Sequence, residues 1–204
     1  VAKKINSEHT VFSLSNRDIY EVLFNVLDYI DDPFADSSSL AVYILSMHTK
    51  KNVTTALSGD GADEIFAGYN KYEAHHRASK RSLQNFLIAK SYFLLKNLPS
   101  SRNGKVSNFI RQLTRFSKGL SLIPGERYWR WCAFTDEADV EKLLLTKPDF
   151  NTYRALKYYY SKNAVDYEMN SILYSDVNLV LANDMLTKVD MMSMANSLEI
   201  RNPF

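Results

Sequence analysis

A short β-branched and apolar run, Val53 to Leu57, leads directly into an acidic turn that contains two glycines. Gly59 and Gly61 can take backbone angles that are closed to other residues, so the chain can turn sharply there. A helical pattern begins at Ala62, and the free N–H groups at a helix start would point out of the turn. This order of strand, turn and helix predicts an anion-binding site.

Three carboxylates lie beside these predicted donors: Asp60, Asp63 and Glu64. Because carboxylates repel a bare phosphate, they favour a cation, Mg²⁺, between themselves and a bound phosphate group. Each carboxylate also has a simpler interpretation. Asp60 can close an Asx turn within its own loop, and Asp63 and Glu64 can compensate the dipole of the helix start.

Composition narrows the class of protein without naming a function. The 204 residues are 46% hydrophobic, enough for one sizeable core or two small ones, and we expect the simpler arrangement, a single domain over residues 1–204. The net charge of +2 gives no electrostatic case for nucleic acid or a membrane surface. Cys132 is the only cysteine, which excludes an internal disulfide and fits a reducing cytoplasm. No apolar run reaches the roughly eighteen residues of a membrane helix.

The remaining pattern is mostly helical. A capping-box-like Ser15 to Asp18 precedes a helix through Ile30, and Ser37 or Ser38 can cap a second helix. Further helices are predicted over 82–97, 107–118, 137–145, 152–160, 166–182 and 184–197, with turns at Pro99, Gly104, Pro124-Gly125 and Pro148. The basic residues between Lys96 and Lys118 are interpreted as a solvated face around a buried stripe of Val106, Phe109, Ile110, Leu113 and Phe116.

Only two strands are predicted, at Thr10 to Leu14 and from Val53. The second is expected to be buried on both faces, as in a parallel α/β sheet, yet two strands are too few for a stable open sheet. The chain also begins without methionine and ends at Arg201-Asn202-Pro203-Phe204. We therefore expect a piece of a longer protein.

Three separated segments together resemble one family, the synthetase domain of glutamine-hydrolysing asparagine synthetases. The segments are Asp32 to Ser38 (DPFADSS), Leu57 to Tyr69 (LSGDGADEIFAGY) and Lys188 to Phe204 (KVDMMSMANSLEIRNPF). They occur in the family's order and at family-like spacing, whereas residues from about Lys71 to Val180 carry little of the likeness.

The resemblance implies an α/β fold of the adenine-nucleotide α-hydrolase (ATP pyrophosphatase) type, predominantly helical in this chain. Family members transfer AMP from ATP to the side-chain carboxylate of L-aspartate, release pyrophosphate, and let ammonia attack the β-aspartyl-AMP to give L-asparagine. The ammonia comes from glutamine through an upstream glutaminase domain, which nothing here matches. The implied cofactors are ATP and Mg²⁺, and the resemblance is compatible with a homodimer.

The resemblance assigns nucleotide contacts to Ser58, Gly59, Gly61 and Tyr69, and the Mg²⁺ ligand to Asp63. Small residues suit places where backbone approaches a ligand closely. An ordinary tight turn is the alternative for Ser58 and Gly59, and a core position is the alternative for Tyr69.

The resemblance also implies catalytic roles for two residues, Asp60 and Lys188. Well-studied members often have glutamate at the position of Asp60, where it orients the substrate amine and takes up a proton; aspartate keeps the base and shortens its reach. Lys188 matches a lysine that neutralises charge developing on the phosphate. A solvated or snorkelling helix residue is the alternative for Lys188. Asp32, Asp36 and Ser37 are expected to border the same cleft, without assigned roles.

The family's main pyrophosphate loop, a Ser-Gly-Gly-x-Asp-Ser turn on the first strand, has no match in this chain. We therefore expect the chain alone to bind ATP weakly and not to turn over. Two other functions stay open: a relative that adenylates a different carboxylate, such as a β-lactam synthetase-like ligase, and a non-catalytic helical interaction module.

Overall fold

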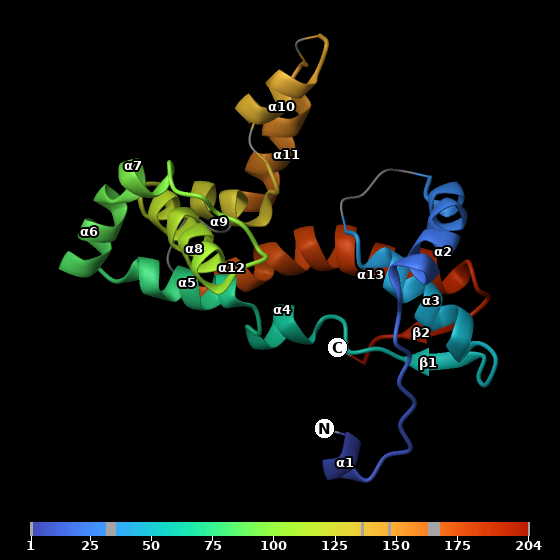
Figure 1. Ribbon diagram of the computed structural model, residues 1–204. Helices are drawn as coiled ribbons and strands as arrows, with labels where there is room; N and C mark the ends of the chain where they lie inside the picture. Colours follow the sequence, from blue (N-terminus) through green and yellow to red (C-terminus); the bar gives the residue numbers. More distant parts are fainter. Residues whose placement is uncertain (1, 32–35, 136, 147, 163–167, 204) are drawn as a thin grey trace. The chain divides into compact units, whose positions relative to one another are not determined.

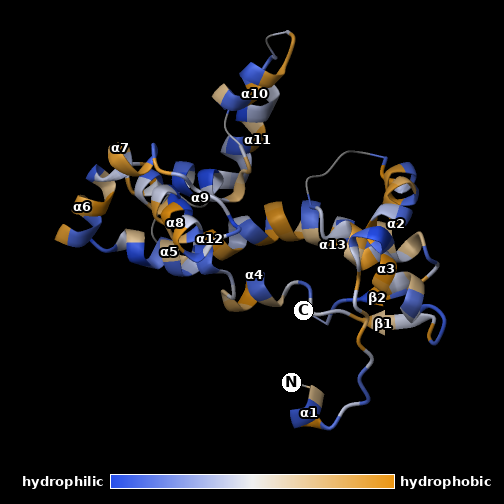
Figure 2. Ribbon diagram, in the orientation of Figure 1, coloured by the Kyte–Doolittle hydropathy of each residue, from blue (hydrophilic) through white to orange (hydrophobic). Residues whose placement is uncertain are grey.

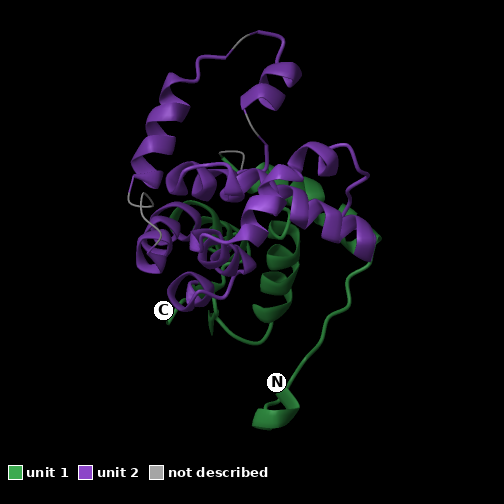
Figure 3. Cartoon of the chain, turned by 90° about the vertical axis from the view of Figure 1, so that its left-hand side faces the viewer, with its two compact units in different colours: residues 1–60, 182–204 green, residues 61–181 purple. Residues whose placement is uncertain are grey.

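The computed structural model describes residues 2–31, 36–135, 137–146, 148–162 and 168–203. The described part of the protein consists mostly of helices and contains one small parallel sheet (Figure 1). The chain divides into two compact units, residues 1–60 with 182–204 (unit 1) and residues 61–181 (unit 2) (Figure 3). The expectation of a single domain over 1–204 remains a prediction. Among the described residues, no helix is both long and apolar enough to cross a membrane.

Unit 1 combines four helices with both strands of the described sheet. Its elements are α1 (Ala2–Ile5), α2 (Asn16–Tyr29), α3 (Ser39–Thr49), β1 (Thr55–Leu57), α13 (Leu186–Met194) and β2 (Glu199–Arg201). α3 contacts both α2 and α13, and α13 also contacts β2. Figure 2 shows hydrophobic residues along much of α3. Val26, Ile44, Val189, Met192 and Leu198 are the buried hydrophobic residues of this unit.

The capping box before α2 is confirmed. The Ser15 N–H donates to Asp18 Oδ2 at 2.7 Å, and the Asp18 N–H donates to Ser15 Oγ at 3.3 Å. At α3 the predicted serine cap is only half right, because Ser38 occupies the N-cap position but its side chain makes no capping bond. Instead, the Ser38 N–H donates to Asp36 Oδ1 at 2.9 Å. The carboxylate thus orders the chain that enters α3.

The sheet differs from the prediction in two ways. Residues 10–14 form no strand, and the partner of β1 is β2, which pairs with it in parallel at Thr55–Glu199, Ala56–Ile200 and Leu57–Arg201. The expected burial on both faces of β1 is also wrong, since Leu57 is 76% exposed and only Ala56 is partly covered. A strand with one described neighbour has one unpaired edge, and here only alternate residues are covered.

Unit 2 is helical in its described part. It holds α4 (Ala62–Phe66), α5 (Asn70–Ser79), α6 (Leu83–Lys90), α7 (Tyr92–Leu95), α8 (Lys105–Leu120), α9 (Pro124–Cys132), α10 (Glu137–Leu143), α11 (Asn151–Ser161) and α12 (Met169–Asp176). α8 contacts α5, α6, α7 and α9, and α12 contacts α4 and α5. A stretch of π-helix, η1 (Val177–Met185), follows α12 in the chain and precedes α13.

Two helix predictions in unit 2 are corrected. The pattern from Ala62 is not one helix, because Ala67 adopts φ 57° and ends α4 after Phe66. The predicted turn at Pro124-Gly125 is the start of α9, where proline at the first helical position needs no N–H partner. The buried hydrophobic core of the unit joins Tyr72, Tyr128 and Ile172 from three helices.

Candidate functional site

The loop after β1 is held at the carboxyl end of the strand by β2. The Ser58 N–H donates to Arg201 O at 3.0 Å, and the Glu199 N–H donates to Thr54 O at 3.0 Å. The ladder therefore continues one residue beyond β1, and the C-terminal segment fixes where the Ser58 loop begins. Parallel α/β sheets commonly bind ligands at this end of their strands.

The two glycines of the loop differ. Gly61 has φ 95° and is the N-cap of α4, so the predicted need for an unusual backbone angle is confirmed there. Gly59 has no positive φ, and a Cβ placed on it would meet no heavy atom within 4 Å. The space beside Gly59 is open, so neither backbone strain nor packing within the described residues demands glycine at this position.

Asp60 interacts with its own loop. The Ser58 hydroxyl donates to Asp60 Oδ2, and both side chains are half-buried. This contact is the local role that was the alternative interpretation of Asp60, made through a serine hydroxyl instead of a backbone N–H. The Oδ1 atom has no hydrogen-bond partner among the described residues and can accept a hydrogen bond from a ligand.

Asp63 is exposed at the first turn of α4, and its position depends on Gly68. The Gly68 N–H donates to Asp63 O at 2.9 Å, and a Cβ on Gly68 would lie 1.8 Å from Asp63 Oδ1. No group of three or more His, Cys, Asp or Glu side chains that could hold a metal occurs in the described part of the chain. A lone exposed carboxylate fits Mg²⁺, which is usually held by one or two carboxylates together with substrate phosphates.

Glu64 and Tyr69 form a pair that sequence reasoning missed. Glu64 is 1% exposed, although a residue that only compensates a helix dipole would be expected to face solvent. The Tyr69 hydroxyl donates to Glu64 Oε1 at 2.8 Å, and its ring packs against the Tyr72 cluster. Burial, then the bond to Glu64, raises the pKa of Tyr69. These contacts favour the core interpretation of Tyr69.

Lys188 is not a solvated helix residue. It is 5% exposed, and its Nζ lies 2.7 Å from Asp36 Oδ2 and 3.4 Å from Met185 Sδ. Burial acts to raise the pKa of Asp36, but the Lys188 ammonium and the Ser38 N–H hold it below its ordinary value. The ion pair joins the first and third of the three segments within unit 1. Asp32 lies outside the described residues, and Ser37 is exposed.

A buried carboxylate in unit 2 was not anticipated. Asp176 is fully buried and accepts hydrogen bonds from the hydroxyls of Tyr72 and Tyr128, the latter at 3.0 Å. Lys71 Nζ lies 2.7 Å from Oδ1 and 2.6 Å from Oδ2 of the same carboxylate. The charge is therefore paired, as a buried carboxylate requires. The only sequence signal was an aspartate four residues after Ile172, on the apolar face of α12.

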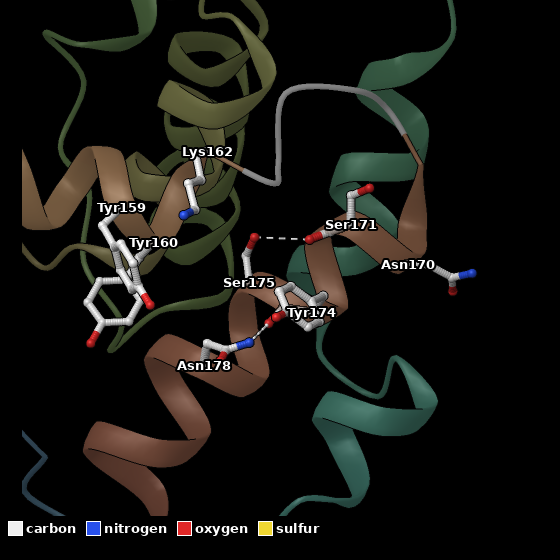
Figure 4. Close-up of a pocket in the computed structure, with 8 residues that line it drawn as sticks. All are labelled: Tyr159, Tyr160, Lys162, Asn170, Ser171, Tyr174, Ser175 and Asn178. Carbon is white, nitrogen blue, oxygen red and sulfur yellow. Dashed lines mark hydrogen bonds between the residues drawn. The ribbon is translucent and has the colours of Figure 1, made fainter.

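Unit 2 also contains a cavity of about 650 Å³ beside α11 and α12 (Figure 4). Its polar groups include Ser175 Oγ, which donates to Ser171 O at 3.0 Å, and Asn178 Nδ2, which donates to Tyr174 O at 2.7 Å. Both bonds stay within the helix. None of the residues that line this cavity belongs to the three family-like segments.

The described part of the chain is rich in helices and contains a small parallel sheet, so the protein belongs to the α/β class. The family model "Asparagine synthase" matches residues 1–204. The chain therefore belongs to the asparagine synthase family.

Relatives agree with this assignment. The chain is 30% identical over 198 residues to "Asparagine synthetase [glutamine-hydrolyzing] 1" of Bacillus subtilis, covering 94% of this chain and 29% of that protein. It is also 30% identical over 207 residues to a "Putative asparagine synthetase [glutamine-hydrolyzing]" of Mycobacterium bovis, covering 100% of this chain and 30% of that protein. The chain thus spans about 30% of the length of these curated relatives. No solved structure matches.

Proposed function

We propose that this chain forms part of an ATP-dependent ligase that converts L-aspartate to L-asparagine. In the first step an oxygen of the aspartate side-chain carboxylate bonds to the α-phosphorus of ATP, and pyrophosphate leaves. In the second step ammonia attacks the carbonyl carbon of the β-aspartyl-AMP, AMP leaves with the bonding electron pair, and the amine gives up a proton.

The observation that carries this proposal is that parts of all three family-like segments meet within unit 1, the second segment through residues 57–60. The Ser58–Arg201 backbone bond ties the loop to the third segment, and the Lys188–Asp36 ion pair ties the third segment to the first. The paired residues lie more than a hundred positions apart in the chain. A fold that brings these segments together supports one site, built from all three.

The loop residues are suited to a nucleotide. In this proposal, the open space beside Gly59 lets the backbone approach phosphate, with Ser58 and Gly61 on either side of that approach. Asp63 would hold Mg²⁺, whose charge neutralises the phosphates when bound. Tyr69 is retained as a nucleotide-side residue, with its hydroxyl committed to Glu64.

Asp60 is proposed to take the proton from the attacking amine, using the Oδ1 atom that Ser58 does not bind. Lys188 is proposed to stabilise negative charge on the phosphate. Because its ammonium is bound to Asp36, it also positions the entry to α3, and these two roles need separate readouts.

The wider context is also proposed from the family. The fold would be the adenine-nucleotide α-hydrolase type, and the ammonia would come from glutamine in a glutaminase domain of a longer, cytoplasmic protein. The 30% coverage of the relatives makes the full-length protein the right material for activity assays.

The test is pyrophosphate release from Mg-ATP by the full-length protein with ammonia, with L-aspartate present or withheld. Aspartate-dependent release with asparagine as the product supports the proposal. Release without need for aspartate indicates a relative that acts on another carboxylate. No release, with activity in the cell unchanged by Asp60→Asn, Asp63→Asn and Lys188→Ala, would indicate a non-catalytic module.

The two roles of Lys188 separate in a second assay. Lys188→Arg keeps a cation, so it should retain the ion pair with Asp36 and the stability of the fold. A lysine that only positions Asp36 predicts a near-normal kcat in this variant, whereas one that contacts phosphate predicts a loss of kcat at unchanged stability.

A further inference from the structure

A second cavity, of about 800 Å³, lies between α5, α6, α8 and α9 in unit 2. Its volume falls in the range of sites for small organic ligands, about 300–1,000 Å³. None of its lining residues belongs to the three family-like segments. It falls in the region from Lys71 to Val180, where the family resemblance is weakest.

The wall of this cavity is basic. It carries Lys71, Arg77, Arg111 and Arg115 against a single carboxylate, Glu73. Lys71 is paired with Asp176, so it adds little uncompensated charge. The three arginines make no ion pair with any described carboxylate.

The arginines instead contact neutral groups. Arg111 donates from Nε and Nη2 to Asn108 Oδ1 at 3.2 and 2.9 Å, and Arg115 Nη2 donates to Trp131 O at 3.1 Å. The Arg77 guanidinium lies over the Phe116 ring, 5.5 Å from its centroid. Burial, followed by Arg130, Arg111 and Arg102, lowers the pKa of Arg115. Three arginines therefore line this wall with one carboxylate, Glu73.

The interpretation of these basic residues as a solvated face around a buried stripe is right only in part. Lys96, Arg102 and Lys105 are exposed as predicted, whereas Arg111 and Arg115 are half-buried. In the predicted stripe, Ile110, Leu113 and Phe116 are half-buried but Val106 and Phe109 are largely exposed, and the fully buried residues of α8 are Ser117 and Gly119. Phe109 and Phe116 face the cavity together with Arg111 and Arg115, because α8 presents both types of residue to it.

An aromatic platform completes the wall. Phe116 and Trp131 stack with centroids 6.0 Å apart at 20°. The Trp131 indole is fixed by its Nε1 bond to Arg115 O at 3.2 Å and by close packing on Gly119, where a Cβ would lie 2.6 Å from the ring. The His75 ring meets the Trp131 indole edge-on, with the two ring centroids 4.5 Å apart. A fixed aromatic ring can contact a ligand with little loss of conformational entropy.

We propose that this cavity binds a phosphorylated ligand that carries an aromatic ring, with a nucleoside monophosphate as the simplest ligand of this class. Arginine guanidinium groups match phosphate oxygens, and Phe116 and Trp131, which both line the cavity, give the ring an aromatic contact. The excess of arginines over Glu73 suits a dianionic phosphate better than a singly charged carboxylate. This binding does not depend on the proposed ligase activity.

The test is titration of the complete chain with AMP in the absence of Mg²⁺. The chain has two tryptophans, so in a Trp129→Phe background the fluorescence reports Trp131 alone. We expect a saturable change with AMP and much weaker changes with adenosine or inorganic phosphate. Arg77→Gln and Arg111→Gln should each weaken binding about tenfold, as expected for a lost charge-assisted hydrogen bond.

Arg81→Gln is the matched control, because Arg81 is exposed and does not line the cavity, and it should bind as the parent does. The proposal is overturned if AMP gives no saturable change at millimolar concentration or if Arg77→Gln binds normally. Binding that is lost in Gly59→Ala but kept in Arg77→Gln would place AMP at the Ser58 loop, and would overturn this proposal while supporting the ligase proposal.

Discussion

The two loop glycines show how one residue type serves two physical purposes. Gly61 is required by its backbone, which has φ 95°, whereas Gly59 sits in open space with an ordinary backbone. The sequence predicted that both glycines permit the turn. It could not show which of them adopts a positive φ, because the spacing of residues does not determine backbone angles. The backbone conformation therefore explains the glycine at position 61. Nothing in the described structure requires glycine at position 59, so its role must involve a ligand.

We predict that Gly61→Ala lowers the free energy of unfolding by about 1–2 kcal/mol, the cost of a left-handed backbone for an L-residue. Gly59→Ala should leave stability unchanged or raise it by a few tenths of a kcal/mol. Urea denaturation of the two variants and the parent measures this difference. Equal stabilities for the two variants would contradict the assignment.

His75 provides a pH-dependent prediction. It is 6% exposed, and burial, then Arg127 and Lys71, lowers its pKa from the ordinary 6.5 to about 3. The unfolded chain therefore binds a proton between about pH 6.5 and 3 that the folded chain does not. Stability contributed by neutral His75 is complete above pH 6.5 and falls as the pH decreases, by up to about 1.4 kcal/mol per pH unit.

The measurement is the free energy of unfolding from pH 7 to pH 4 in the parent and in His75→Phe, which cannot titrate. We expect a shallower fall in His75→Phe. His76→Phe, next to it in the sequence but exposed, should keep the slope of the parent. A slope that is the same in all three proteins would show that His75 does not titrate as a buried neutral ring.

At the scale of elements, the Asp36–Lys188 ion pair connects the entry of α3 to α13. We predict that Lys188→Met lowers the free energy of unfolding by about 3 kcal/mol, because it leaves a partly buried carboxylate unpaired. Asp36→Leu combined with Lys188→Met should recover most of that loss. Chemical denaturation of the single and double variants tests the pair, and additive losses would contradict it.

The same pair contributes to acid sensitivity. The folded pKa of Asp36 lies below its ordinary 3.8, so its stabilisation is complete above about pH 4 and is lost as the pH falls through the folded value. Asp36→Asn should therefore lose less stability below pH 4 than the parent does. Asp28→Asn, an exposed carboxylate of α2, serves as the control and should follow the parent.

Elements defined by neighbouring residues were predictable, and those defined by distant partners were not. The capping box of α2 is local, so Ser15 and Asp18 identified it. Strand β2 exists because Glu199 pairs with Thr55, 144 residues away, and its charged three-residue sequence gives no strand signal. The family-like segments identified the loop, but not that Glu64 would be buried or that Asp176 would gather two tyrosines and a lysine.

At the scale of the whole chain, the division into two units passes through the loop, between Asp60 and Gly61. Ser58, Gly59, Asp60 and Lys188 belong to unit 1, and Gly61, Asp63 and Tyr69 belong to unit 2. Each half of the loop is therefore described within its own unit. Family membership rests on the match over residues 1–204, whereas the activity rests on what the loop contacts.

The most direct test of the central claim is aspartate-dependent pyrophosphate release by the full-length protein, compared between the parent and Gly59→Ala. The added methyl group enters space that is open in the protein, so only a ligand there can be affected. We predict release that requires L-aspartate and falls at least about tenfold in Gly59→Ala, a loss of roughly 1.4 kcal/mol or more in transition-state stabilisation at unchanged fold stability. Aspartate-dependent release at the parent rate in Gly59→Ala would show that no nucleotide approaches this loop and would contradict the account.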